Sequence, residues 1–393
     1  ATIAVAENGK IIVEPGAKLN LNNVVMHALT TQWEGIEVRS SLYQLQPPAP
    51  ITSTMSNFSG TGLLFMTNCC VENARIGLLM GKRNWIGSNV QTYEGGGLVV
   101  ASYCNFTNNR THVLFDGYNP ITINYNIENL SRFEKCIFLT DEKAMLSLSR
   151  PPTREMVKLF DSKKVNFYSC QWEYYNRENM YNDTVFGIFG YKTAVRLTKS
   201  PSGPTNKFFN LIDYGVFLLD PDRPSNIEDA DFQSANGIYI NESSLDKIVR
   251  NNFKYSGFVN NTNDAVGIYL QNCTNYKVEN NIFSTYSGNK VGKIGIVVNN
   301  SGPNTNKIYN NTFSSIEQGI WCQNQNYDPL TNNGLVLNCN DFANVDYNIG
   351  VRKDYVPSNN TGIAEYQGNL INPLQSTRNT YNTPACVNEN KFY

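Results

Sequence analysis

"KVENNIFSTYS" occupies residues 277–287, and a close relative, "KIYNNTFSSIEQGI", occupies residues 307–320. Two further copies, "IVRNNFKYSG" at 248–257 and "LVLNCNDFANV" at 335–345, keep the same order of a short apolar run, Asn and then Phe. The aromatic residue of the motif therefore returns every 29 or 30 residues, at Phe253, Phe283, Phe313 and Phe342. A motif that returns at a nearly fixed interval indicates a chain built from stacked structural repeats.

A second piece, Gly-Ile followed by another apolar residue two places on, alternates with the first. It reads "GIYI" at 237, "GIYL" at 267, "GIVV" at 295 and "GIWC" at 319, with earlier variants at 35, 77 and 215. Apolar residues at period two indicate short strands with one face turned inward, and polar corners such as "QNCTN" separate them. The period of 24–34 residues predicts one coil of a right-handed parallel β-helix, an all-β solenoid of about eleven or twelve coils.

Stacked coils explain the residues of the motif without any chemistry. We expect one Asn of the pair to adopt the left-handed conformation at a corner, and the other to pass hydrogen bonds along a ladder of like side chains. The Phe should stack on the Phe of the next coil, and the Gly should open a strand where space is short. In the first half Cys replaces the Asn, and Phe106, Phe138 and Trp172 take the Phe position.

The cysteines in that register are Cys69 or Cys70, Cys104, Cys136 and Cys170. They are open to two interpretations, a disulfide or metal framework and a column of inert buried thiols, and we favour the second because parallel side chains suit a disulfide poorly. No CxxC motif is present, and the two histidines are His27 and His112, so no metal or other cofactor is predicted.

We predict one domain over residues 1–393, with entry coils at 1–38. Segments rich in Pro, Ser or charge predict loops that leave the wall near 40–60, 141–164 and 198–206, and the charged 141–164 loop could hold a short helical turn. Residues 360–393 are predicted to be C-terminal coils that continue in a longer chain.

The composition excludes several classes of partner. The chain of 393 residues carries a net charge of −1, which argues against nucleic acid, and it has no run of 18 apolar residues, so no membrane-spanning segment is predicted. Asparagine is the unusual residue, with 57 copies, as expected for a chain with many tight corners. We expect a secreted protein whose signal has been removed.

Residues at both ends carry a resemblance to a known class. "IIVEPGAKLNLNNV" with "WEGIEV", and "GLVLNCNDFANVDYNIGVRKD" with "GIAEYQGN", resemble the opening and closing coils of large secreted β-helix proteins of Bacteroidetes. This resemblance, which extends at fold level to the pectin-lyase-like β-helices, implies type IX secretion and an extracellular or cell-surface location. It implies no catalytic residue.

Because pectin-lyase-like helices include polysaccharide-cleaving enzymes, we looked for catalytic groups. Basic candidates for proton abstraction are Lys192, Arg196 and Lys199, which are more simply explained as a solvated outer face. An acidic cluster that could bind calcium is more simply a solvated turn, and it comprises Asp220, Asp222, Glu228, Asp229 and Asp231.

Aromatic candidates for a sugar platform lie in "QWEYYNRENMYND". The repeat register places Trp172 in the core, whereas the tyrosines are expected to be exposed, namely Tyr174, Tyr175 and Tyr181. No catalytic, metal or specific binding residue is assigned.

The sequence thus predicts a non-catalytic, scaffold- or adhesin-like β-helix module, with a polysaccharide or a surface or secretion-system protein as partner. The alternative is a lyase or glycoside hydrolase that acts on acidic polysaccharide.

Overall fold

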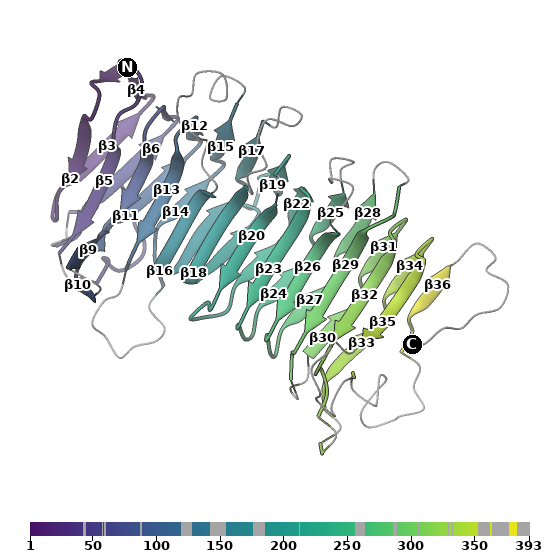
Figure 1. Ribbon diagram of the computed structural model, residues 1–393. Helices are drawn as coiled ribbons and strands as arrows, with labels where there is room; N and C mark the ends of the chain where they lie inside the picture. Colours follow the sequence, from purple (N-terminus) through teal and green to yellow (C-terminus); the bar gives the residue numbers. More distant parts are fainter. Residues whose placement is uncertain are drawn as a thin grey trace. The chain divides into compact units, whose positions relative to one another are not determined.

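The computed structural model describes residues 1–41, 45–56, 58, 60–86, 89–118, 128–141, 155–175, 185–211, 213–255, 264–285, 289–302, 304, 306–328, 330–331, 333–352, 362–363 and 377–382, with the backbone alone over 82–86 and 89–95. Strands, turns and irregular segments account for all of these residues, and none of them is helical. The chain divides into two compact units, Ala1–Ile212 and Asp213–Tyr393. Each is a right-handed parallel β-helix with three walls (Figure 1), which confirms the predicted fold class.

The first unit is built from nineteen strands in its described residues. They are β1 (Thr2–Val5), β2 (Lys10–Val13), β3 (Lys18–Asn22), β4 (Val25–Ala28), β5 (Gly35–Ser40), β6 (Leu63–Thr67), β7 (Cys70–Glu72), β8 (Ile76–Met80), β9 (Lys82–Ile86), β10 (Asn89–Gly96), β11 (Leu98–Ser102), β12 (Asn105–Thr107), β13 (Thr111–Asp116), β14 (Arg132–Glu134), β15 (Ile137–Thr140), β16 (Glu155–Tyr168), β17 (Gln171–Tyr174), β18 (Phe186–Thr198) and β19 (Asn206–Phe209). The strands β1, β4, β7, β12, β15, β17 and β19 pair in that order, all in parallel, to form one wall.

The second unit repeats the three-wall coil more regularly. Its described strands are β20 (Tyr214–Leu219), β21 (Asn226–Glu228), β22 (Ala230–Gln233), β23 (Asn236–Asn241), β24 (Lys247–Val249), β25 (Asn252–Tyr255), β26 (Ala265–Gln271), β27 (Lys277–Glu279), β28 (Ile282–Thr285), β29 (Lys293–Asn299), β30 (Asn306–Tyr309), β31 (Thr312–Ser314), β32 (Gln318–Gln323), β33 (Leu335–Asn338), β34 (Asp341–Ala343), β35 (Tyr347–Arg352) and β36 (Thr380–Asn382). We call the wall formed by β20, β23, β26, β29, β32 and β35 the long-strand wall.

The interior of each unit contains the predicted stack of aromatic rings, which we call the ring column. In the second unit the ring centroids of Phe232, Phe253, Phe283, Phe313 and Phe342 follow one another at 4.7–4.9 Å, with neighbouring rings within 7° of parallel. These separations equal the spacing of paired strands, about 4.8 Å, because each coil adds one ring directly above the last. In the first unit the same position holds Phe106, Phe138, Trp172 and Phe208.

The asparagine pairs behave as predicted. Asn280 and Asn310 are left-handed, with φ of 58° and 54°, and the Asn after each points inward. The buried Asn281 accepts hydrogen bonds from Asn251 at both its backbone nitrogen and its side-chain Nδ2, and donates to Asn311 Oδ1 and to the Ile248 carbonyl. Each coil thus satisfies polar groups of the coil before it with its own Asn side chain.

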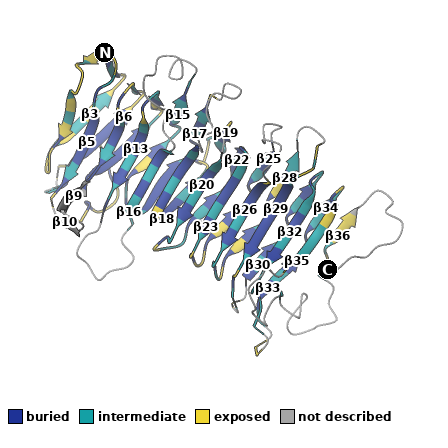
Figure 2. Cartoon of the chain, in the orientation of Figure 1, coloured by how far each residue is buried: buried dark blue, intermediate teal, exposed yellow. Residues whose placement is uncertain are grey.

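The glycine of the Gly-Ile piece is required by the ring beside it. A Cβ built on Gly237, Gly267 or Gly295 would lie 2.4–2.6 Å from an edge carbon of the Phe ring in the same coil. The two recurring pieces are therefore coupled, because the Phe fills the space that a larger residue would need. Figure 2 shows the result in both units, with buried residues alternating with partly buried ones along the strands.

Of the predicted loops, one is confirmed and another is partly a strand. Residues 199–205 form a turn, as expected, but Glu155–Tyr168 is the long strand β16, so the prediction of a loop through 164 with a helical turn is wrong over 155–164. Its charged residues favour a loop on composition, but the outward positions of a strand also accept charge. Residues 142–154 lie outside the described part of the chain.

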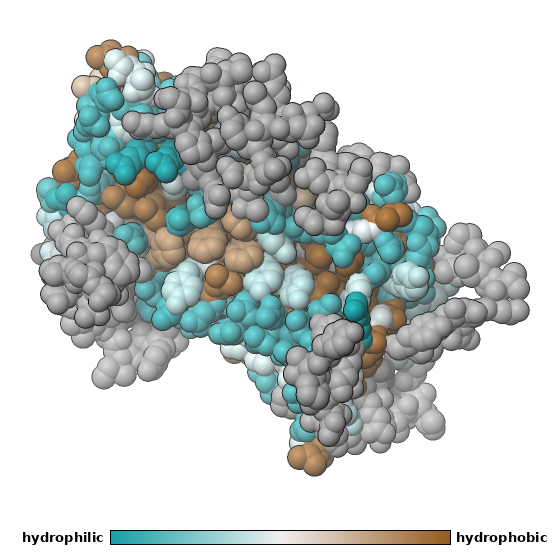
Figure 3. Space-filling view, in the orientation of Figure 1, coloured by the Kyte–Doolittle hydropathy of each residue, from teal (hydrophilic) through white to brown (hydrophobic). Residues whose placement is uncertain are grey.

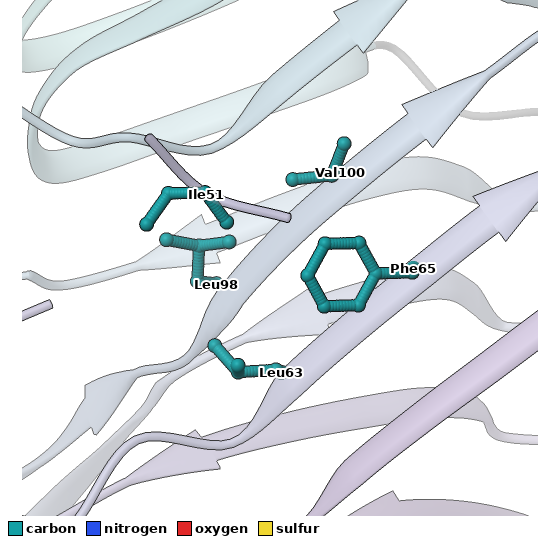
Figure 4. Close-up of a cluster of buried hydrophobic side chains, with 5 residues drawn as sticks. All are labelled: Ile51, Leu63, Phe65, Leu98 and Val100. Atoms are coloured by element: carbon teal, nitrogen blue, oxygen red, sulfur yellow. The ribbon is translucent and has the colours of Figure 1, made fainter. Parts of the chain in front are cut away.

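The 40–60 segment contains no strand after Ser40 in its described residues, but it lies against the wall instead of leaving it. Ile51 packs on a patch of the first unit made by Leu63 and Phe65 of β6 and by Leu98 and Val100 of β11 (Figure 4). This contact buries apolar side chains on the outer side of the coil, so the segment is an integral part of the first unit.

Gln46 fastens the same segment. Its side chain donates to the Gly97 carbonyl at 3.2 Å and to Asn129 Oδ1 at 3.0 Å, and it accepts from the Leu130 amide at 2.6 Å. Its backbone amide donates to the Tyr118 hydroxyl. The side chain and backbone of the buried Gln46 together therefore join the segment to three other parts of the first unit.

Two predictions on domain boundaries stay predictions. The described entry residues form β1–β5 as parallel rungs, and Thr380–Asn382 pairs with β34, which places one further rung within 360–393. The division into two compact units does not test the prediction that residues 1–393 form one domain. Most of 360–393 lies outside the described residues.

Candidate functional site

The predicted basic residues of β18 (Phe186–Thr198) and of the turn after it do not converge on a reaction centre. Lys192 is exposed, with its ammonium 5.6 Å from the ring centroid of Tyr191, and Lys199 is exposed in the turn after the strand. Arg196 lies 3.5 Å from Glu128 Oε1. Two of these side chains are therefore exposed to solvent and the third lies beside a carboxylate.

The predicted acidic cluster is divided among separate partners. Arg250 binds Glu228 at 2.8 Å and Asp229 at 2.9 Å, whereas Asp231 accepts from Asn252 at 3.2 Å. Asp222 pairs with the adjacent Arg223, and Asp220 is half-buried in a left-handed conformation. In the described part of the chain, no three His, Cys, Asp or Glu side chains lie close enough to hold a metal ion.

The predicted sugar platform is largely interior. Trp172 is fully buried in the ring column, as expected, but Tyr174 is 2% exposed, so its predicted exposure is wrong. Trp172 and Tyr174 are two residues apart in one strand and therefore point to the same side. Tyr175 is 40% exposed, and Tyr181 lies outside the described residues.

Four of the five cysteines of the first unit form the predicted column, with Cys69 rather than Cys70 as its first member. Cys69, Cys104, Cys136 and Cys170 are buried and reduced, and the amide after each of the last three donates to the carbonyl of the cysteine before it at 2.8–2.9 Å. A hydrogen bond with Cys136, with burial also contributing, raises the pKa of Cys104 to about 12. The Cys104 thiol is thus held in the protonated form, which is unreactive.

Two ionisable groups of the first unit are buried for structural reasons. His112 lies 3.4 Å from both Asn109 and Thr140, and burial lowers its pKa to about 3, so the ring is neutral. Glu37, 1% exposed, accepts from Lys10 at 2.7 Å and Arg39 at 2.6 Å; burial raises its pKa, but these hydrogen bonds outweigh burial and hold it below the ordinary value. The sequence pattern did not single out Glu37.

The most distinctive surface lies on the outside of the long-strand wall. Directly paired outward residues form what we call the aromatic column: Phe217, Tyr239, Tyr269, Val297 and Trp321. Two positions further along each strand lies what we call the amide column: Asn241, Gln271, Asn299 and Gln323. All are half-buried except Val297, which is 2% exposed beneath its neighbours.

Hydrogen bonds tie the two columns together. The Tyr239 hydroxyl donates to Gln271 Oε1 at 2.8 Å, and the Tyr269 hydroxyl lies 3.4 Å from Gln323 Oε1 and accepts from Asn299 at 3.3 Å. Both rings therefore lean toward later coils along the direction of stacking. Figure 3 shows apolar and near-neutral side chains over β23, β26, β29 and β32, bordered by polar ones.

The sequence contains a signal for this surface that the predictions above did not use. The outward residue is the third letter of each Gly-Ile piece, Tyr in "GIYI" and "GIYL", Val in "GIVV" and Trp in "GIWC". The apolar residues of these pieces predict the strands, and the third residue marks the position that faces outward.

Comparison with known proteins gives one family match. Residues 205–383 match the model of a family described as periplasmic copper-binding protein (NosD), so the second unit is similar to that family. No curated protein matches the sequence. In the described residues, no helix is long and apolar enough to cross a membrane.

The matched residues do not fit a copper site. Copper in proteins is bound mainly by thiolate, thioether and imidazole ligands, and residues 205–383 contain no His and no Met. Of the three cysteines there, Cys273 and Cys322 are fully buried, and burial raises the pKa of each to about 12. Buried protonated thiols are poor metal ligands, so these two cysteines do not supply a copper site within the matched residues.

Solved structures show distant likeness. The Streptococcus pneumoniae surface protein and adhesin PfbA is 11% identical, with 88% of this chain and 90% of that chain covered and a TM-score of 0.49. A mannuronic acid specific polysaccharide family 6 lyase from human gut microbiota is 10% identical, with 90% and 74% covered and a TM-score of 0.31. The siphovirus 9NA tailspike receptor binding domain is 8% identical, with 92% and 74% covered and a TM-score of 0.23. At these values none of the three assigns a function to this chain.

Proposed function

We propose that the protein is a non-catalytic, extracellular or cell-surface binding module of the scaffold or adhesin kind. It presents its outer walls and loops to a glycan or to a partner protein. Type IX export, which the sequence resemblance implies, belongs to the same proposal.

One observation carries the proposal, namely the separation of the ionisable candidates. Hydrolysis of a glycoside bond requires two carboxyl groups that face each other across the substrate, and a lyase requires a base beside bound substrate. Here Glu228 and Asp229 share Arg250, and Arg196 lies beside Glu128. The repeating residues, in contrast, are explained by packing and hydrogen bonds between coils, which is what a rigid display surface needs.

The experiment that separates this function from the alternative uses polysaccharide degradation. The full chain is incubated with pectin, alginate and chondroitin, and unsaturated products and reducing ends are followed over time. We expect no product above the protein-free blank. Product formation that falls in Lys192→Ala or Arg196→Ala would establish the lyase or hydrolase instead.

A binding assay tests the positive half of the proposal. Labelled full chain is applied to a glycan array and to intact bacterial and host cell surfaces, with heat-denatured chain as the control. Saturable binding to one of these surfaces is expected. Its absence from all of them would favour a purely structural piece of a secreted protein.

A further inference from the structure

We propose that the aromatic and amide columns of the long-strand wall bind an uncharged glycan chain, which runs from coil to coil along the direction of stacking. This inference rests on the proposed binding function and names its ligand class and its site. Three features of the surface support it: its unpaired donors, its lack of charge and its period.

The first feature is a set of hydrogen-bond donors without a protein partner. Tyr239 and Tyr269 occupy Oε1 of Gln271 and Gln323, and within the described residues neither Nε2 group has an acceptor. The indole Nε1 of Trp321 likewise has none in that part of the chain, and its side chain is half-buried. Glycan hydroxyls are acceptors that suit such donors, and the rings offer apolar surface for the C–H faces of sugars.

The second feature is the absence of charged side chains within the two columns, whose nearest carboxylate is Glu242, 3.5 Å from the Asn241 side chain at the first coil. Across β20, β23, β26, β29 and β32, the residues of the two columns are aromatic, aliphatic or amide, and none is ionisable in the physiological range. The next coil adds Arg352, whose guanidinium lies 5.6 Å from the Trp321 ring centroid. An acidic glycan would lose hydration of its carboxylates without gaining a row of cations, whereas an uncharged glycan has no such cost.

The third feature is the period. Gln271, Asn299 and Gln323 lie on successive coils, about 4.8 Å apart, so the two unpaired amide groups are separated by about 9.6 Å. One coil matches the length of one sugar unit, and two coils match a disaccharide. A polymer with that repeat can therefore make the same contact several times along one wall.

The surface is also ordered before any ligand arrives. Tyr269 and Trp321 pack on a buried floor of Val266, Ile294 and Val297, and the tyrosine hydroxyls are held by the amide column. Phe217 and Tyr239 stack on each other at 4.5 Å, so a sugar would pack across the exposed edges of leaning rings. Fixed side chains lose little conformational entropy on binding, which favours affinity.

The test uses affinity electrophoresis of the full chain in gels that contain soluble uncharged polysaccharides, namely hydroxyethylcellulose, galactomannan, xyloglucan or dextran. Polygalacturonate serves as the charged comparison. We expect retardation by at least one uncharged polymer. Trp321→Ala should weaken that binding about tenfold, as truncation of a central interface aromatic commonly does. The double variant Gln271→Ala/Gln323→Ala should weaken it by a similar factor, because two hydrogen bonds are lost.

Matched controls separate binding from folding. Trp321→Phe should retain most of the affinity, and Tyr175→Ala and Gln171→Ala, which change an exposed ring and an amide of the first unit, should bind as the unchanged chain does. Thermal melting of each variant checks the fold. Retardation by polygalacturonate alone, retardation by none of the uncharged polymers, or equal retardation of Trp321→Ala and the unchanged chain would each overturn the assignment. Product formation in the degradation assay, in contrast, would refute the proposed function itself.

Discussion

Replacing Asn281 by Ala tests whether the buried asparagine ladder holds the coils of the second unit together. Asn281 is fully buried and makes four side-chain hydrogen bonds of 2.9–3.0 Å, to the Asn251 amide, the Asn251 side chain, the Ile248 carbonyl and Asn311. At about 1 kcal/mol net for each bond, their loss amounts to about 4 kcal/mol of unfolding free energy. The backbone N–H of Asn251 loses its acceptor while remaining buried, so the true loss should not be smaller.

The measurement combines urea unfolding with hydrogen exchange. Because repeat proteins can unfold in parts, the exchange of the Asn251 amide is followed by mass spectrometry of the peptide that contains it. We expect a lower unfolding midpoint and loss of protection in that peptide. Ile282→Ala, at a neighbouring residue that is 48% exposed, should change stability by less than about 1 kcal/mol.

Asn281→Asp distinguishes lost hydrogen bonds from lost volume. The carboxylate can still accept from Asn251, but it must be protonated to donate to Ile248 or Asn311, so its pKa in the folded chain should lie above the value of about 3.9 in the unfolded chain. The folded state then binds more protons, and the variant should gain stability as the pH falls from the folded-state pKa toward about 3.9. An Asn281→Ala variant with an unchanged midpoint and a protected Asn251 amide would refute the ladder argument.

Three further predictions concern other contacts. Gly267→Ala should destabilise the second unit, because the new Cβ would lie 2.6 Å from the Phe283 ring. The double variant Gly267→Ala/Phe283→Leu should lose less unfolding free energy than the two single variants together, as measured by a double-mutant cycle of urea unfolding. Gln46→Ala should make residues 45–56 more sensitive to limited proteolysis, with a loss of about 2–3 kcal/mol, whereas an unchanged cleavage pattern would contradict its fastening role. His112→Gln should reduce the acid sensitivity of the first unit, because the folded-state pKa of His112, about 3, lies below the unfolded value of about 6.5. His112 therefore costs stability as the pH falls from 6.5 to 3, by up to about 1.4 kcal/mol per pH unit. Parallel profiles of unfolding free energy against pH for the variant and the parent would rule this out.

The interior of the fold could be predicted from the sequence because it repeats. Phe283 and Asn281 recur at the same place in each coil, so their environment could be inferred from the period alone, and the ring column and the Asn ladder follow from it. The course of non-repeating segments could not be inferred in this way. The charged stretch at 155–164 is a strand whose outward positions face solvent, and the Pro-rich 40–60 segment lies on the wall through Ile51 and Gln46.

The candidate site was harder to predict than the fold for a related reason. Catalytic residues were sought as clusters in the sequence, but residues adjacent in the chain alternate between the inside and the outside of a coil. Residues that share one outer face, such as Tyr239 and Tyr269, come from different coils and are 30 positions apart. Such a surface is visible only when the copies are aligned on their inward residues.

The same alternation explains how one solenoid can carry different surfaces. In β23, Ile238 and Ile240 are fully buried, whereas Tyr239 and Asn241 point outward, so each short strand has separate positions for packing and for recognition. In the first unit, paired outward positions of β5 and β8 hold Glu37 and Leu79. Outward residues contribute little to the packing between coils, and they can change in chemistry while Gly, Phe and Asn keep the coil intact. We therefore expect Gln271→Ala/Gln323→Ala to alter binding at nearly constant stability and Asn281→Ala to do the reverse; loss of stability in both would mean that recognition and packing are not separate in this fold.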